Sequence, residues 1–150
     1  MFFPTVCPRK RVNWWGFCYT FAMAPRVVVF LDEQNVYRGA RRAFFDFSDH
    51  YSCGNFHPMA LGDLLISRLP HGVKEKRELV EVRLYTGTPN PQYDPKSHAA
   101  FLARSQAWQA EGATVVSRPL RYPTKAPPGE QKGVDVALAV DFVVMAVGGV

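Results

Sequence analysis

An apolar run, VVVFL at residues 27–31, ends abruptly at Asp32 and constrains the fold more than any other feature of this chain. Apolar residues without alternation are typical of a strand that is buried on both faces of a parallel sheet. Open α/β sheets bind their ligands beyond the carboxyl ends of such strands. Asp32 is therefore a candidate site residue, or it is only the N-cap of the next helix, a position that Asp favours.

Helical and strand patterns alternate along the rest of the chain. We expect strands over 26–31, 79–85 and 113–116, and helices over 35–45, 58–69, 96–111 and 133–147. This order implies parallel strands joined by helical crossovers. The sequence therefore predicts an α/β fold with three layers, α/β/α, around a parallel sheet.

Two of these helices show apolar positions that we expect to face the core. In the first helix they are Val36, Ala40, Ala43 and Phe44, and in the third they are Ala99, Leu102, Ala103 and Ala107. Phe101 and Trp108 lie on the third helix as well, and we expect them to be packing residues.

Composition narrows the class of protein. Arg9, Lys10 and Arg11 contribute three of the 18 basic residues, so residues 23–150 carry 15 basic against 13 acidic residues and are only mildly basic. An odd number of cysteines, three, indicates neither a disulfide framework nor a four-cysteine zinc site. The cysteine count makes a reducing interior the default, so we expect a cytoplasmic protein. No apolar run approaches the roughly 18 residues of a membrane span, so we expect no membrane partner.

Residues 1–23 form an N-terminal extension with crowded aromatic residues and no regular period. A translation start at Met23 is the favoured interpretation. The alternatives are a secretory signal, with Ala22-Met23-Ala24 as the cleavage site, and a disordered or docking extension. The domain itself is expected over residues 24–150.

Acidic residues recur where the last predicted helix begins. Lys132 and Asp135 open that helix, and parallel crossovers bring its first turn to the sheet edge that also holds Asp32. Two carboxylates there suit Mg²⁺ or Mn²⁺, although an acid in a first helical turn is also favoured by the helix dipole alone. Asp141 lies about 120° around the helix from Asp135, so it fits a supporting role or a solvated face.

The segment before this helix is rich in basic residues and proline. Its candidates for binding a nucleic-acid backbone and stacking a base are Arg118, Arg121, Tyr122, Lys125 and Lys132. A solvated loop is the alternative. The chain contains no P-loop, no Gly-x-Gly-x-x-Gly after the first strand and no Gly-x-Ser-x-Gly, which disfavours kinase, nucleotide-redox and serine-hydrolase chemistry.

Three segments together, VVVFLDEQNVY, RLYTGTP and KGVDVALAVD, resemble the NYN domain (LabA/DUF88-like) of the PIN-like nuclease superfamily. The resemblance implies a bacterial metal-dependent ribonuclease. It assigns Asp32 as a metal ligand, Asn35 as a substrate-binding or ligand-orienting residue, and Asp135 as the helix acid. It also implies that Asp141 is a second helix acid and that Lys132 approaches a phosphate.

The chain departs from that family in two places. Glu33 and Gln34 stand within a segment that usually reads as DGxN, and the family's later Ser-x-Asp-x-Asp motif does not occur before Val150. We therefore expect a C-terminally incomplete domain with weak or no activity, which associates with itself or with partner proteins. The alternatives are a non-catalytic RNA-binding or regulatory module and, less favoured, a phosphatase-like hydrolase with Asp32 as its nucleophile.

Overall fold

The computed structural model describes residues 11–12, 18–19, 24–68 and 77–148. Its elements, in chain order, are β1 (Arg11–Val12), β2 (Cys18–Tyr19), β3 (Arg26–Asp32), α1 (Glu33–Phe44), α2 (Pro58–Ser67), β4 (Glu78–Thr88), α3 (Pro95–Ala110), β5 (Thr114–Pro119) and α4 (Val134–Gly148). The predicted alternation of strands and helices is thus confirmed. Strand β4 is longer than predicted.

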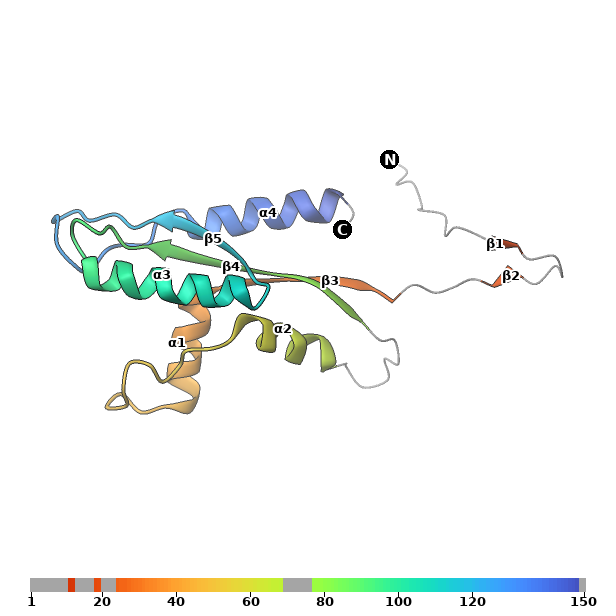
Figure 1. Ribbon diagram of the computed structural model, residues 1–150, viewed down its shortest axis with the longest axis horizontal. Coiled ribbons are helices and arrows are strands. Elements are labelled where there is room, and N and C mark those ends of the chain that lie inside the picture. The colour runs from red at the N-terminus through yellow and green to blue at the C-terminus, as the bar shows by residue number, and fades with distance from the viewer. Residues whose placement is uncertain (1–10, 13–17, 20–23, 69–76, 149–150) are drawn as a thin grey trace.

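Three parallel strands in the order β3-β4-β5 form the sheet (Figure 1). At its carboxyl edge Asp32 of β3 lies beside Tyr85 of β4, and Thr88 of β4 lies beside Pro119 of β5. The short strands β1 and β2 pair with each other in the antiparallel sense. The α/β class and the parallel sheet are therefore confirmed.

One face of the sheet packs against α2 and α3. Val82 and Leu84 of β4 have no exposed surface there, and Trp108 of α3 is 8% exposed in the same cluster. Gly62 allows α2 to approach closely, because a Cβ atom at this position would lie 2.7 Å from Cγ2 of Val82. This face therefore holds the larger apolar core.

Helix α4 covers the other face, along the opposite side of the sheet from α2 (Figure 1). Tyr85 is fully buried in a second cluster with Val134 and Ala137, and Phe30 of β3 packs against it. Helices thus lie on both faces of the sheet, and the predicted three layers are present.

Two details of the predicted helix faces are wrong. In α1 Ala43 is exposed and Phe44 is 78% exposed, so neither faces the core. In α3 the buried positions are Phe101, Ser105 and Trp108, whereas Leu102 is 44% exposed. The large aromatic side chains remove more apolar area from water than the alanines, so their stripe faces the sheet and the alanine stripe turns away.

Much of the apolar surface of α4 stays exposed. Five of its valines are more than half exposed, namely Val136, Val140, Val143, Val144 and Val147. In the described part of the chain, no helix combines the length and apolar character that crossing a membrane requires.

Candidate functional site

Asp32 ends β3 and caps α1. Its Oδ1 accepts a hydrogen bond from the backbone N–H of Asn35 at 2.9 Å, and its Oδ2 accepts one from the side-chain amide of Asn35 at 3.1 Å. The helix begins two residues earlier than predicted because Asp32 supplies this cap. A carboxylate has about four lone-pair positions, so these bonds orient Asp32 and leave acceptor capacity for a ligand. The two interpretations of Asp32 are thus compatible.

The first turn of α4 lies over the same edge of the sheet. Val134 packs in the cluster that contains Tyr85, and Tyr85 is the register partner of Asp32. Asp135 is the next residue and is exposed. The structure therefore brings the helix turn that carries Asp135 to the strand ends where Asp32 lies.

Asp141 is held by β4. Its Oδ2 accepts hydrogen bonds from the hydroxyl of Tyr85 at 2.8 Å and from Nη2 of Arg83 at 3.0 Å. Burial and the hydrogen bond to Asp141 together raise the pKa of Tyr85 to about 12. Desolvation lowers the pKa of Arg83, but the hydrogen bond with Tyr85 and the neighbouring acidic groups outweigh it, so this pKa rises. Asp141 thus anchors α4 to the sheet.

Few side chains at this edge of the sheet are available to bind a metal ion. Among the residues that the structure describes, no group of three or more His, Cys, Asp or Glu side chains could hold a metal ion. Asp32 and Asp135 remain for this role, since Asp141 is engaged by β4. Mg²⁺ is commonly bound through one or two carboxylates together with waters and substrate phosphates. Two carboxylates therefore fit a site in which waters and substrate phosphates supply the remaining ligands. They do not fit a site in which the protein alone surrounds the ion.

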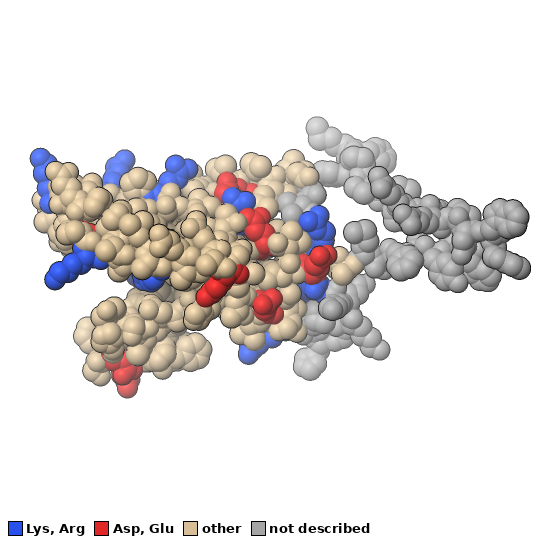
Figure 2. All heavy atoms as spheres, in the orientation of Figure 1, with Lys and Arg blue, Asp and Glu red and all other residues tan. Residues whose placement is uncertain are grey.

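The end of β5, which carries Arg118, and the segment between β5 and α4 present their basic side chains to solvent. Arg118, Arg121, Lys125 and Lys132 are exposed, and Figure 2 shows Lys and Arg side chains projecting from the end of the molecule that carries these loops. Arg121 and Glu130 exchange backbone hydrogen bonds of 2.9 and 2.7 Å, which brace the segment. The loop is thus shaped by its own backbone pairing.

Tyr122 lies in this segment but is half-buried. Its hydroxyl accepts a hydrogen bond from the backbone N–H of Asn90 at 3.2 Å, and its ring lies 5.3 Å from that of Tyr93. These contacts join the loops that follow β4 and β5. Tyr122 is therefore a loop-positioning residue as well as the predicted stacking candidate.

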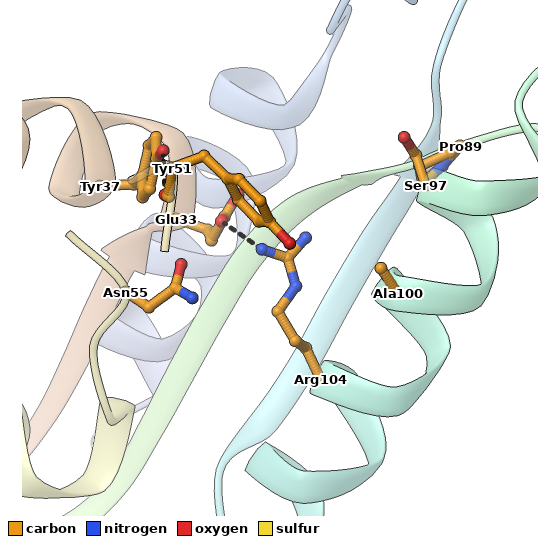
Figure 3. A pocket seen from close by; sticks show the side chains of 8 residues that line it. All are labelled: Glu33, Tyr37, Tyr51, Asn55, Pro89, Ser97, Ala100 and Arg104. Atoms are coloured by element: carbon orange, nitrogen blue, oxygen red, sulfur yellow. Dashed lines mark hydrogen bonds and ion pairs between the residues drawn. The ribbon is translucent and has the colours of Figure 1, made fainter. Parts of the chain in front are cut away.

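A cavity of about 300 Å³ opens at the same edge, between α1, the loop 45–57 and α3 (Figure 3). Its lining residues are Glu33, Tyr37, Tyr51, Asn55, Pro89, Ser97, Ala100 and Arg104. In the sequence Glu33 stands out only as a departure from the DGxN motif. Its position directly after the strand is the one signal in the sequence that points to this cavity, because the other residues come from distant segments.

Comparison with protein-family models, with curated protein sequences and with solved structures finds no match for this chain. The fold therefore shows only the structural class of the chain, which is an α/β protein with a parallel three-stranded sheet. The resemblance to NYN domains stays a prediction from the three sequence segments.

Proposed function

We propose that this chain is an NYN-type, PIN-like metal-dependent ribonuclease domain, which hydrolyses RNA phosphodiester bonds at the carboxyl edge of its sheet. One observation carries the proposal. Asp32 ends a parallel strand with both carboxylate oxygens oriented by Asn35, and the first turn of α4 with Asp135 packs over the same strand ends. Ligands of open α/β sheets bind at this position.

The acidic residues divide into ligands and supports. Asp32 and Asp135 would hold Mg²⁺ or Mn²⁺, and Asn35 keeps the carboxylate of Asp32 in place. Such an ion, when bound, activates water and neutralises charge on the phosphodiester. Asp141 acts through Arg83, because their ion pair fixes the helix that carries Asp135.

RNA would bind along the basic segment. Arg118, Arg121, Lys125 and Lys132 are exposed cations that can contact backbone phosphates. Tyr122 supports the loop and is half-buried, and the face of its ring is the proposed stacking surface for a base. We propose that the protein is located in the cytoplasm and that its substrate there is RNA.

A second candidate is a non-catalytic RNA-binding or regulatory module of the same fold. It is favoured by the engagement of Asp141 with Arg83 and Tyr85, which leaves two acids for a metal ion. Fewer anionic ligands mean weaker Mg²⁺ binding. This module would bind RNA through the same basic segment without cleaving it.

Cleavage and binding assays with a fluorescent single-stranded RNA separate the two candidates. With Mn²⁺ present, we expect Asp32→Asn to lower the cleavage rate by about 100-fold, because a metal ligand is lost, and to change RNA affinity little. Asp63→Asn, an exposed acid on α2, is the matched control and should leave both values unchanged.

Three outcomes of these assays decide the function. RNA binding by the unaltered chain without any cleavage would establish the binding module. Cleavage that persists in Asp32→Asn would remove Asp32 from the site. A chain that neither binds nor cleaves RNA would contradict both proposals.

A further inference from the structure

The cavity of Figure 3 has a wall that is held rigidly. Tyr51 lies on the loop 45–57, and its backbone carbonyl oxygen accepts a hydrogen bond from the hydroxyl of Tyr37 at 2.6 Å. Arg41 donates to three more carbonyl oxygens of this loop, those of Asp49 at 3.1 Å, His50 at 2.6 Å and Cys53 at 3.2 Å. Because both tethers come from α1, the loop is positioned before any ligand arrives. Such preorganisation lowers the entropy lost on binding.

The floor of the cavity is a carboxylate with unused acceptor capacity. Oε2 of Glu33 accepts a hydrogen bond of 3.3 Å from the hydroxyl of Thr86, and Oε1 lies 3.9 Å from Nη1 of Arg104. The second distance is too long for a hydrogen bond. The side chain of Glu33 is 18% exposed, and its contact with Arg104 is an ion pair that leaves Oε1 without a hydrogen-bond donor from that guanidinium. A carboxylate in this state favours a ligand that offers N–H donors.

The walls offer flat surfaces. Tyr51 is 75% exposed, and its side chain points toward Glu33 and Arg104 in Figure 3. The guanidinium of Arg104 lies 5.8 Å from the ring centroid of Trp108, which supports it from behind. Aromatic rings and guanidinium planes are the surfaces on which proteins stack unpaired RNA bases.

The ligand that fits this combination is planar and has two adjacent donors. The Watson–Crick edge of guanine presents N1–H and N2–H side by side, which matches the two oxygens of a carboxylate. Adenine and cytosine present one amino donor beside an acceptor, and uracil presents one donor between two acceptors. A volume of about 300 Å³ is at the small end for ligand sites and suits one base.

We propose that this cavity binds a guanine base of the RNA substrate. Glu33 accepts hydrogen bonds from N1–H and N2–H, and Tyr51 stacks on the base. The inference rests on the proposed function, because it assigns a base preference to that same site. Glu33 follows Asp32 directly, so the cavity opens at the same edge of the sheet as the proposed metal site.

Calorimetric titration of the whole chain with guanosine and adenosine 5′-monophosphate tests this without metal, in the presence of a chelator. We expect the guanine nucleotide to bind at least about 10-fold more tightly, the usual scale of discrimination by a bidentate contact. Glu33→Gln replaces one acceptor by a donor and should abolish that preference while leaving adenosine monophosphate affinity unchanged. Tyr51→Ala, at an exposed position, should weaken both nucleotides.

The matched control is Glu111→Gln, which alters an exposed glutamate paired with His57 in a different groove beside α3. It should leave both affinities unchanged. Equal affinity for the two nucleotides, no binding at millimolar concentration, or an unchanged preference in Glu33→Gln would each overturn the proposal. Circular dichroism of each variant verifies that it is folded.

The nucleotide titration tests the cavity and the RNA cleavage assay tests the ribonuclease, so each proposal can be refuted without the other. A guanine preference in a chain that cleaves no RNA keeps the cavity assignment and removes the ribonuclease. Cleavage without any guanine preference keeps the ribonuclease and removes the cavity assignment.

Discussion

On one face of β4, Val82 and Leu84 are fully buried beneath α2 and α3, whereas on the other face Arg83 and Tyr85 reach across to Asp141 of α4. Apolar burial is non-directional, while an ion pair and a hydrogen bond fix position and register. The α4 face also leaves five valines exposed. The face of the sheet beneath α3 therefore supplies most of the apolar stability, and polar contacts position the helix that carries Asp135.

The largest effect on this comparison should come from Leu84→Ala. Removing a fully buried leucine should lower the free energy of unfolding by about 2–5 kcal/mol, through lost burial and a cavity. Val143→Ala on α4 is the matched truncation at a position that is 58% exposed, and it should change stability by less than about 0.5 kcal/mol. Urea unfolding measures both. Equal losses would mean that the two faces do not differ in this way.

Asp141→Asn should have the next largest effect. Replacing the carboxylate weakens two charge-assisted hydrogen bonds and should lower the free energy of unfolding by about 1–3 kcal/mol. Because Tyr85 shares this network, the double variant with Tyr85→Phe should lose less than the sum of the single losses, by at least about 0.5 kcal/mol. Strict additivity would contradict a shared network.

The polar face should also respond to pH. The pKa of Tyr85 in the folded chain is about 12, above the ordinary tyrosine value of 10.0. A raised pKa in the folded state gives stability that is fully present below pH 10 and is lost as the pH rises toward 12. The free energy of unfolding should therefore fall more steeply over this window in the unaltered chain than in Tyr85→Phe. If the free energy of unfolding fell equally with pH in both proteins, the pKa of Tyr85 would not be raised in the folded chain.

The smallest expected effect comes from replacing either of two glycines, Gly54 and Gly112, which both have a positive φ angle. Gly54 has φ of +111° and lies where a Cβ would be 2.8 Å from Cγ of Arg41, whereas Gly112 has φ of +100° and open space. Each change to alanine should lower stability by about 1–2 kcal/mol from the strained backbone. Only Gly54→Ala should also weaken nucleotide binding, because it displaces Arg41 from the loop that holds Tyr51. Weakened binding in Gly112→Ala would contradict this assignment.

Sequence patterns could predict the order of strands and helices because apolar periodicity and helix-terminating residues are local signals. The VVVFL run correctly indicated a parallel strand, and Asp32 its carboxyl end, but the expected burial on both faces was wrong. β3 lies at the edge of the sheet and only Leu31 is buried, whereas the fully buried strand residues belong to β4. Long-range pairings could not be predicted in the same way. Arg83 and Asp141 are 58 residues apart, and their contact depends on how α4 lies over β4.

The helix faces and the cavity show two further limits. In α3 two apolar stripes competed, and the larger side chains of Phe101 and Trp108 decided which one faces inward. Glu33 and Arg104 come together only through the packing of α1 and α3 around the sheet. Such placements depend on tertiary geometry, which local periodicity does not encode.

Electron paramagnetic resonance measures the affinity of the chain for Mn²⁺. It can therefore show whether Asp32 and Asp135 form the proposed metal site and whether Asp141 only supports it. We expect the unaltered chain to bind one Mn²⁺ ion, Asp32→Asn and Asp135→Asn each to weaken that binding by about 10–100-fold, and Asp141→Asn to weaken it less than either. Unchanged Mn²⁺ affinity in Asp32→Asn, or a loss in Asp141→Asn as large as in Asp32→Asn, would contradict the account.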